Sequence, residues 1–475
     1  MKQLLLHPLV FTLLFGVALL YLIIGFQLLS RHKRWAEIVE MIFLVLSMLI
    51  IGGMSISFLR FIGRFSPEAL YAPEITLPYL LMPLGFYIPF LILLFPRFYY
   101  TFQNLRYVLM ILIKKNPAFC IYNLMLIMSF LVSNTPEHTL KASLIFSIIT
   151  FFLVYIGKQY DTIKLFNFLN YYHVVVLFLS LAIGNKTIPW TGIYIHKNDF
   201  GATMALAFSL MYLQSVRMPK YKGLFLSLAA LAFFCVLQSQ GGLARVLLVV
   251  LISLSGFLNF IRRLPPRVAF ASMGIFLAIG ISLTILITEN AEYIIVEKLG
   301  KDMTLTGRTY IWTKVVKSIN KRPLFGYGHE GFWQFWRGWD NPALAIRITE
   351  VGSGDMIPEH SHCGYLDVGL NLGWLGLAMF LLSLVTAIYY GILHLTRSQG
   401  SEGLFPLVIL TWIIMKNTTD GGISDISIGW ILYVLITVRL TMNTLENFSY
   451  HPQFQKPLAL EATFPFARTS IRDKE

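Results

Sequence analysis

Charged residues are scarce in this sequence. Only 13% of its 475 residues are Asp, Glu, Lys or Arg, whereas hydrophobic residues make up 56% and the mean hydropathy is +0.67. A water-soluble domain carries roughly 25% charged residues. The shortage excludes a chain whose surface is covered mainly by water, and the composition indicates an integral membrane protein.

Cysteine is also rare, with three residues in the whole chain. So few cysteines exclude a disulfide framework. Cys120 and Cys235 lie in apolar runs and are expected to be packing residues, whereas Cys363 directly follows His362. Two interpretations remain for Cys363, a nucleophilic Cys–His pair or an unreactive thiol.

Long apolar runs, by contrast, are abundant. A helix needs about 20 such residues to cross a bilayer. We therefore predict an all-α fold, a polytopic transmembrane helical bundle of about 11–13 spans. The segment 98–113 is expected to lie at the membrane interface or to be re-entrant. The predicted spans lie near 9–29, 38–58, 78–95, 117–133, 142–157, 165–184, 199–216, 223–238, 245–260, 268–287, 365–390, 403–415 and 421–440.

One long polar interval interrupts these spans and divides the chain. We expect four parts, which are listed here in chain order: an N-terminal transmembrane bundle (1–287), a large extracytoplasmic catalytic loop containing short helices (288–364), C-terminal transmembrane helices (365–440) and a cytoplasmic tail (441–475).

The formal charge of +14 lies largely in short connectors between spans. Lys and Arg collect in cytoplasmic connectors of membrane proteins. We therefore place 217–222 and 261–267 inside and predict no nucleic-acid partner. The span count then places the polar loop outside, on the same face as the connectors 134–141, 185–197 and 239–244.

Within the loop, TGRTYIWTKVVKSIN has the apolar spacing of an amphipathic helix, with Ile311, Val315 and Ile319 on one face. Arg308 then lies in its first turn, where free N–H groups and the helix dipole favour an anion. A guanidinium beside such a site suits phosphate. A solvated arginine at a helix start is the alternative.

The next segment, RPLFGYGHEGFW, contains three glycines that permit tight turns with the backbone close to a ligand. Trp333 and Trp336 are expected at the bilayer interface, and stacking against sugar rings is the alternative.

The segment EHSHCGYLD places His360 and His362 just before a helix. Paired imidazoles are compatible with zinc if His329 and Glu359 complete the site. An HxH pair lacks a clear set of further ligands in the same loop, however, and general-base chemistry needs only one imidazole oriented by a partner. Solvated histidines before a helix are the third interpretation.

Two further groups lie on the same predicted face. The segment WTGIYIHKNDFG contains His196, Lys197 and Asn198 at the entrance of a span, and SQGGLAR contains Arg245. Charges at such positions are functional groups or interfacial anchors. Lys416 and Asp420 occupy an outer turn between the last two spans.

Together, WTGIYIHKNDFG, LGKDMTLTGRTYIW, RPLFGYGHEGFW and HSHCGYLDVGLNLGWLGL resemble the O-antigen ligase/polymerase superfamily. The closest resemblance is to exopolysaccharide polymerases of the succinoglycan polymerase type, and it extends from about Pro136 to Asp425. Two positions depart from the family pattern. Cys363 stands where the family commonly has Asn, and the arginine of the family's serine–arginine motif appears displaced as Arg245.

The resemblance implies an inverting, metal-independent glycosyl transfer. The donor is expected to be an undecaprenyl-diphosphate-linked oligosaccharide repeat unit, with no cofactor. It implies His362 as the base or orienting group for the acceptor hydroxyl and Arg308 as the clamp on the diphosphate. The residues expected to assist substrate binding are Lys197, Arg245, His360, His196 and Asn198.

This resemblance predicts polymerisation of lipid-linked repeat units into an exopolysaccharide or O-antigen-type glycan. The location would be the bacterial inner (plasma) membrane, with the site facing the periplasm or the cell exterior. Membrane lipid, a chain-length regulator and a flippase of the same pathway are the expected partners. A ligase that transfers finished glycan to lipid A core or another acceptor is the alternative. A transporter of lipid-linked glycans is a third interpretation, disfavoured by the histidines of the loop.

Overall fold

The structure is a computed structural model. It describes the residues listed here: 23–25, 28, 32–51, 106–299, 307–347, 357–398 and 400–446. The predicted span near 78–95, most of that near 9–29, and the predicted tail beyond Glu446 lie outside these residues.

The described part of the chain is helical and contains no strand, only an isolated bridge between Asn185 and Gly192. Its main helices are α3 (Lys33–Ile51), α7 (Pro117–Met128), α8 (Pro136–Gln159), α9 (Thr162–Ala182), α10 (Lys197–Arg217), α11 (Lys222–Ser239), α12 (Gly242–Ile261), α13 (Pro266–Leu299), α14 (Gly307–Lys321), α15 (Gly364–Arg397), α16 (Phe405–Thr419) and α17 (Ile428–Glu446). Short 3₁₀ helices are η2 (Ser129–Leu131), η3 (Pro219–Tyr221), η4 (Phe335–Asp340), η5 (Pro342–Ile346) and η6 (Ser401–Gly403).

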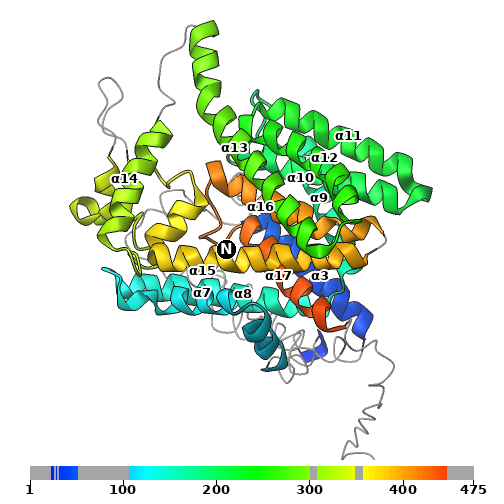
Figure 1. The fold of residues 1–475 in the computed structure, drawn as a ribbon, viewed down its shortest axis with the longest axis horizontal. Coiled ribbons are helices and arrows are strands. Elements are labelled where there is room, and N and C mark those ends of the chain that lie inside the picture. Colours follow the sequence, from blue (N-terminus) through cyan, green and yellow to red (C-terminus); the bar gives the residue numbers. More distant parts are fainter. Residues whose placement is uncertain are drawn as a thin grey trace, which may run out of the picture.

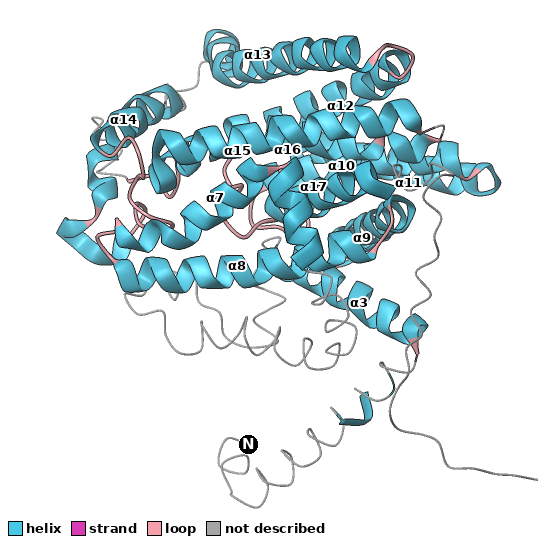
Figure 2. Cartoon of the chain, turned by 60° about the horizontal axis from the view of Figure 1, so that its bottom comes forward, coloured by secondary structure: helices cyan, strands magenta, loops and turns pink. Residues whose placement is uncertain are grey.

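Most of the long helices run along one common direction, and α14 lies at one end of the bundle (Figures 1 and 2). Six helices in the described residues are long and apolar enough to cross a membrane, or seven if one bent pair counts as a span. The prediction of an all-α polytopic membrane protein is confirmed.

The bent pair is Arg106–Lys115 followed by Pro117–Leu131, with an angle of 109° between the two helices. The bend occurs at Asn116, whose side-chain oxygen accepts a hydrogen bond from the N–H of Phe119 and so caps α7. Proline at the first position of α7 has no N–H to pair. A break between 106–115 and α7 agrees with the expectation that this stretch is interfacial or re-entrant.

Several helices that match predicted spans, among them α10, α16 and α17, are not among the six. α16 has 15 residues, and nearly all of its side chains are buried. α10 buries polar side chains such as Ser209 and Gln214 along with its apolar ones. Because these helices are surrounded by protein, they do not need the length or uniform apolarity that lipid contact requires.

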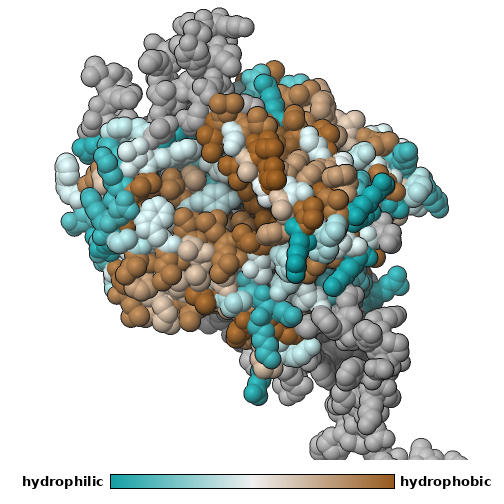
Figure 3. Space-filling view, in the orientation of Figure 1, coloured by the Kyte–Doolittle hydropathy of each residue, from teal (hydrophilic) through white to brown (hydrophobic). Residues whose placement is uncertain are grey.

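The lipid-facing surface is formed by helices around this interior. Large apolar side chains such as Phe178, Ile252, Ile275 and Leu382 are about half exposed. Figure 3 shows apolar side chains in a broad band across the middle of the molecule, with hydrophilic ones toward the end that carries α14 and toward the other end. This distribution is typical of a bundle that crosses a bilayer.

The packing centre of α7, α8, α15 and α17 is Trp430, which is fully buried. Its ring lies 4.7 Å from that of Phe146, 5.8 Å from that of Tyr122 and 5.5 Å from that of Tyr433, measured between centroids. Its indole N–H donates a hydrogen bond of 2.9 Å to Thr150 Oγ1. The buried indole of Trp430 is therefore closely packed, and its N–H group has a hydrogen-bond partner.

We predict that Trp430→Ala lowers the free energy of unfolding by about 3–5 kcal/mol, because it leaves a large cavity and orphans the Thr150 hydroxyl. Thermal or SDS-induced unfolding of the purified protein in detergent measures this change. The matched control is Trp339→Ala, since Trp339 is 86% exposed. Equal effects of the two substitutions would contradict the packing described here.

Candidate active site

The loop between α14 and α15 is docked onto a break in α15. At Gly373 the backbone φ is +70°, and the helix is interrupted there. The carbonyl oxygen of Leu370 accepts a hydrogen bond of 2.8 Å from the N–H of Tyr327. The carbonyl oxygen of Asn371 accepts one of 2.9 Å from the N–H of Gly328. The loop therefore satisfies backbone groups that the break leaves without helical partners.

Glycines make this close approach feasible. Gly326 has a φ of +65°, and a Cβ atom there would lie 2.4 Å from the carbonyl oxygen of Leu370. A Cβ at Gly373 would lie 2.5 Å from the carbonyl oxygen of Pro323. Gly326 of RPLFGYGHEGFW thus lies against the α15 backbone, whereas Gly328 lies against Ser129 and Ser133, so these glycines serve close packing within the protein and not the predicted approach to a ligand.

The same loop also contacts the connector before α8. Arg322 donates hydrogen bonds to the carbonyl oxygen of Val132 (3.0 Å) and to Asn134 Oδ1 (2.7 Å). Glu330 lies 3.6 Å from His138 Nε2. The structure therefore places the predicted outer connector 134–141 at the same end of the bundle as the loop.

Arg308 lies in the first turn of α14. The buried face of this helix carries Ile311, Val315 and Ile319, as its amphipathic spacing predicts. Ile319 packs toward Gly369 of α15, where an added Cβ would lie 2.8 Å from Ile319 Cδ1. This packing holds α14 against α15 and leaves Arg308 partly exposed at the helix start.

The histidine loop, which we define as residues 358–363, is held by a set of local hydrogen bonds. The N–H of His362 donates to His360 Nδ1 at 3.0 Å, and Ser361 Oγ donates to the carbonyl oxygen of Cys363 at 2.7 Å. Trp312 of α14 donates its indole N–H to the carbonyl oxygen of Ser361 at 3.0 Å. Because His360 Nδ1 accepts a hydrogen bond, neutral His360 has its proton on Nε2.

His362 has an unusual backbone and an unusual electrostatic environment. Its φ is +55°, a left-handed conformation that costs about 1–3 kcal/mol in a non-glycine residue and clusters at functional sites. Burial lowers the pKa of His362 to about 4, and His360 and Arg308 add to this effect, whereas Asp420 and Glu359 oppose it. His362 is therefore neutral at pH 7, and Arg308 is close enough for its charge to act on the ring.

A lysine–carboxylate cluster lies beside the histidine loop. Lys416 Nζ at the end of α16 lies 3.0 Å from Asp199 Oδ1 and 3.2 Å from Asp420 Oδ2, and its side chain is only 13% exposed. Asp199 belongs to the first turn of α10. Burial raises the pKa of Asp420, but the charges of Lys416 and His360 outweigh it and hold this pKa below its usual value.

His360 and Asp367 meet at Gly421, directly after this cluster. A Cβ at Gly421 would lie 3.2 Å from His360 Nδ1 and 3.5 Å from Asp367 Oδ2. Asp367 Oδ1 accepts hydrogen bonds from the indole N–H of Trp333 (3.1 Å) and from the N–H of Ser361 (3.2 Å). The absence of a side chain at Gly421 lets these polar groups come together.

The structure brings some predicted site residues together and leaves others apart. Arg308, His360 and His362 share one site. His196 and Lys197 are exposed at the start of α10, adjacent in sequence to Asp199. Arg245 is exposed on the first turn of α12, and no described contact joins it to the histidine loop.

Asn198 lies where the starts of α10 and α12 adjoin at this end of the bundle. Its Oδ1 would be 3.3 Å from a Cβ atom built on Gly241. The predicted outer connectors 185–197 and 239–244 therefore also gather near the loop.

Two alternatives for the histidine segment can be compared with the geometry. Burial raises the pKa of the Cys363 thiol to about 11, so it is protonated at pH 7 and unsuited to nucleophilic attack. Among the residues that the structure describes, no three His, Cys, Asp or Glu side chains are placed to share a metal ion.

Sequence analysis missed Asp367 and Trp333 as site residues. Trp333 was expected at the bilayer interface, but its indole is hydrogen-bonded to Asp367. The spacing of Asp367, five residues after His362 and in the first turn of α15, was the available signal. Asp199 stands at the entrance of a span and Lys416 in a predicted outer turn, but their pairing joins helices far apart in the chain and leaves no sequence pattern.

Comparison with known proteins bears on the same residues. A family model described as O-antigen ligase matches residues 224–381, which include Arg245, Arg308, His360 and His362. The exopolysaccharide production protein ExoQ of Rhizobium meliloti (strain 1021) is 26% identical over 229 residues, or 45% of this chain. The match spans about half of that relative, 51% of its length. Both matches are similarities to the O-antigen ligase/polymerase superfamily, and they support the resemblance that the sequence motifs indicate.

Proposed function

We propose that this protein polymerises oligosaccharide repeat units carried on undecaprenyl diphosphate into an exopolysaccharide or O-antigen-type glycan. One observation carries the proposal: a neutral, strained histidine, His362, lies near the cation Arg308 at the start of a helix. The name of the relative from Rhizobium meliloti, an exopolysaccharide production protein, supports this class of product.

We propose a direct displacement at the anomeric carbon of the donor. The acceptor hydroxyl oxygen forms a bond to the anomeric carbon of the donor sugar, and the bond from that carbon to the diphosphate oxygen breaks. The bonding electrons leave with the lipid diphosphate, and the hydroxyl proton moves to His362. Attack opposite the leaving group inverts the anomeric configuration. Because a sugar hydroxyl is a weak acid, His362 acts as bond formation acidifies it.

Arg308 stabilises the departing diphosphate in this mechanism. Its guanidinium and the free N–H groups at the start of α14 form an anion-binding position. Interactions with charge that develops in the transition state contribute the largest single share in many transferases. Lys416 is less suited to this role, since two carboxylates already neutralise it.

Donor binding also tunes the base. Arg308 lowers the pKa of His362 in the free protein. When a diphosphate neutralises Arg308 and adds negative charge, the pKa of His362 rises, and the imidazole becomes a stronger base. The protein thereby keeps His362 uncharged until the donor is present.

The lysine–carboxylate cluster and Asp367 are positioning groups. Asp367 holds the N–H of Ser361, and Gly421 lies against His360 and Asp367. Lys416 fixes Asp420 and so the turn that carries Gly421. These contacts set where the histidine loop lies relative to Arg308.

A ligase that transfers finished glycan to lipid A core or another acceptor is the second candidate, and the description of the matching family model favours it. Both reactions use the same donor and the same groups. They differ in product length. Loss of a polymerase leaves single repeat units, whereas loss of a ligase leaves long polymer on the carrier lipid.

We propose that the active site faces the periplasm or the cell exterior. Basic connectors lie at the end of the bundle away from the histidine loop, at 217–222 and 261–267. Such connectors are retained on the cytoplasmic side.

His362→Ala and Arg308→Ala are each expected to slow polymer formation by about 10²–10⁴-fold, the range typical of a lost general base or of a lost charge-stabilising group. Membranes supplied with lipid-linked repeat units and analysed for chain length give the readout. The controls are His32→Ala and Arg267→Ala, exposed residues away from the site. Near-normal polymer from folded His362→Ala and Arg308→Ala proteins would refute the proposal.

The pH dependence provides an independent check. Since the pKa of free His362 is about 4, kcat/KM should stay level from pH 7.5 to about pH 5 and fall only below that, as the base becomes protonated. In the donor complex the pKa is higher, so kcat should begin to fall at a higher pH than kcat/KM. Steady-state rates measured across this range, with protein stability checked at each pH, give the pH profiles of both kcat/KM and kcat. A kcat/KM limb near pH 6.5 would exclude this environment for His362.

Lys416→Met is expected to destabilise the protein by about 3 kcal/mol, because Asp420 then lies buried without its counterion. Lys416→Met combined with Asp420→Asn should recover part of this stability, since it removes the orphaned charge. Thermal unfolding in detergent measures both. The double variant should keep the wild-type KM for the donor but have a lower kcat, because the histidine loop is displaced. A Lys416→Met protein as stable and active as wild type would contradict this role.

A further inference from the structure

A cavity of about 470 Å³ lies at the end of the bundle opposite the histidine loop. It is bounded by the last turns of α10 and α12 and by the start of α16. α10 and α12 begin beside the site, and α16 ends there, so these segments belong to the other end. The volume lies in the range of about 300–1,000 Å³ typical of small-molecule sites.

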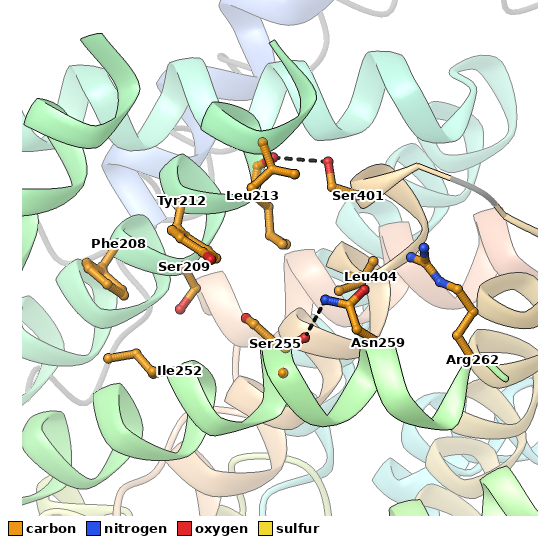
Figure 4. A pocket seen from close by; sticks show the side chains of 12 residues that line it. Phe208, Ser209, Tyr212, Leu213, Ile252, Ser255, Asn259, Arg262, Ser401 and Leu404 are labelled. Atoms are coloured by element: carbon orange, nitrogen blue, oxygen red, sulfur yellow. Dashed lines mark hydrogen bonds between the residues drawn. The ribbon is translucent and has the colours of Figure 1, made fainter. Parts of the chain in front are cut away.

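The cavity is apolar at one end and polar at the other. On α12, Ile252, Ser255, Gly256, Asn259 and Arg262 follow one another on a single helix face. Figure 4 shows Phe208 and Ile252 at one end of the cavity and Arg262 at the other, with Leu404 beside Asn259. The lining therefore changes from apolar to cationic along the helix axis.

The cavity wall formed by α10 and the loop before α16 also has an apolar part and a polar part. Phe208 and Leu213 supply apolar surface, and Ser401 Oγ donates a hydrogen bond of 3.0 Å to the carbonyl oxygen of Leu213. Because this hydroxyl and the hydroxyls of Ser209 and Ser255 bond to helix carbonyl groups, the apolar part presents few competing donors. Such a surface suits a hydrocarbon chain.

The cationic end continues into a second, polar cavity of about 430 Å³. Asn259 and Arg262 line both cavities, and Arg263, Thr396 and Ser398 complete the second one. Glu402 brings one negative charge near this region, where it lies 3.8 Å from Arg217 Nε. Arg262 Nη2 also donates a hydrogen bond of 3.0 Å to the carbonyl oxygen of Gly400. Among the described residues of this region, Arg217, Arg262 and Arg263 face the single carboxylate of Glu402, and the excess of positive charge favours an anion.

The length of the cavity indicates the kind of ligand. Ten residues of helix separate Ile252 from Arg262, which is about 15 Å at 1.5 Å per residue. This length is half of the hydrocarbon thickness of about 30 Å, and so the depth of one leaflet. An acyl chain beside Ile252 would place its headgroup at Arg262 and Arg263.

We propose that this cavity binds a glycerophospholipid with an anionic headgroup, drawn from the membrane leaflet at that end of the bundle. One acyl chain lies between α10 and α12, and the phosphate lies at Arg262 and Arg263. Basic pockets between transmembrane helices recognise anionic headgroups by the same chemistry. The bound lipid links the ends of α10, α12 and α15.

Gly256 offers a clean way to fill the cavity. A Cβ atom built on Gly256 meets no atom within 4 Å, so a larger side chain has room to enter the cavity without a clash. Gly274 on α13 also has no atom within 4 Å of an added Cβ, and it does not line the cavity. Gly256→Leu and Gly274→Leu are therefore a matched pair with the same change in helix propensity.

The test uses the full chain, purified and delipidated in detergent. Thermal unfolding is followed with added phosphatidylglycerol, phosphatidylethanolamine of the same acyl chains, glycerol 1-phosphate, or a polyprenyl phosphate. Phosphatidylglycerol should raise the Tm of wild type and Gly274→Leu by about 2–4 °C and leave that of Gly256→Leu unchanged. Arg263→Gln should weaken phosphatidylglycerol binding about fivefold, as the loss of one cation predicts.

Other outcomes would overturn the proposal. An equal shift with phosphatidylethanolamine would remove the role of the anionic headgroup, and an equal shift with glycerol 1-phosphate would show that the acyl chain does not bind. A larger shift with polyprenyl phosphate that Gly256→Leu abolishes would make the carrier lipid the occupant. A full phosphatidylglycerol shift in Gly256→Leu would exclude this cavity.

Discussion

The candidate site depends on one buried cation. Lys416 lies between Asp199 of α10 and Asp420 of the turn after α16, and so joins segments more than 200 residues apart in sequence. Removing charges from water is costly unless they are paired. The pairing fixes the turn that carries Gly421, against which His360 and Asp367 lie. The position of the histidine loop follows from this arrangement.

A second constraint acts from the loop side. The break of α15 at Gly373 exposes carbonyl groups inside a membrane helix, where unpaired polar groups are costly. The segment around Tyr327 and Gly328 pairs with them. The polar interval is thus attached to α15 by backbone hydrogen bonds, and α14 with Arg308 is held near His362 by the same docking. Helix break, loop and candidate site form one unit.

The sequence was sufficient for the fold class and for part of the site. Hydropathy predicted the all-α membrane bundle, and apolar spacing predicted α14 with its buried Ile311, Val315 and Ile319. The sequence also suggested Arg308, His360 and His362 as site residues. The sequence could not reveal that Trp333 faces Asp367, or that Arg245 lies apart from the histidine loop. Both depend on tertiary pairing between distant segments, which has no local period in the chain.

The most direct test of the account is a transfer reaction with the purified protein in lipid nanodiscs, supplied only with a defined repeat unit on undecaprenyl diphosphate. We expect two or more units to become joined by a new glycosidic bond whose anomeric configuration is inverted relative to the donor linkage. A joined product that retains the donor configuration would contradict the direct displacement described here. Failure of the folded protein to join any units would contradict its assignment as a polymerase.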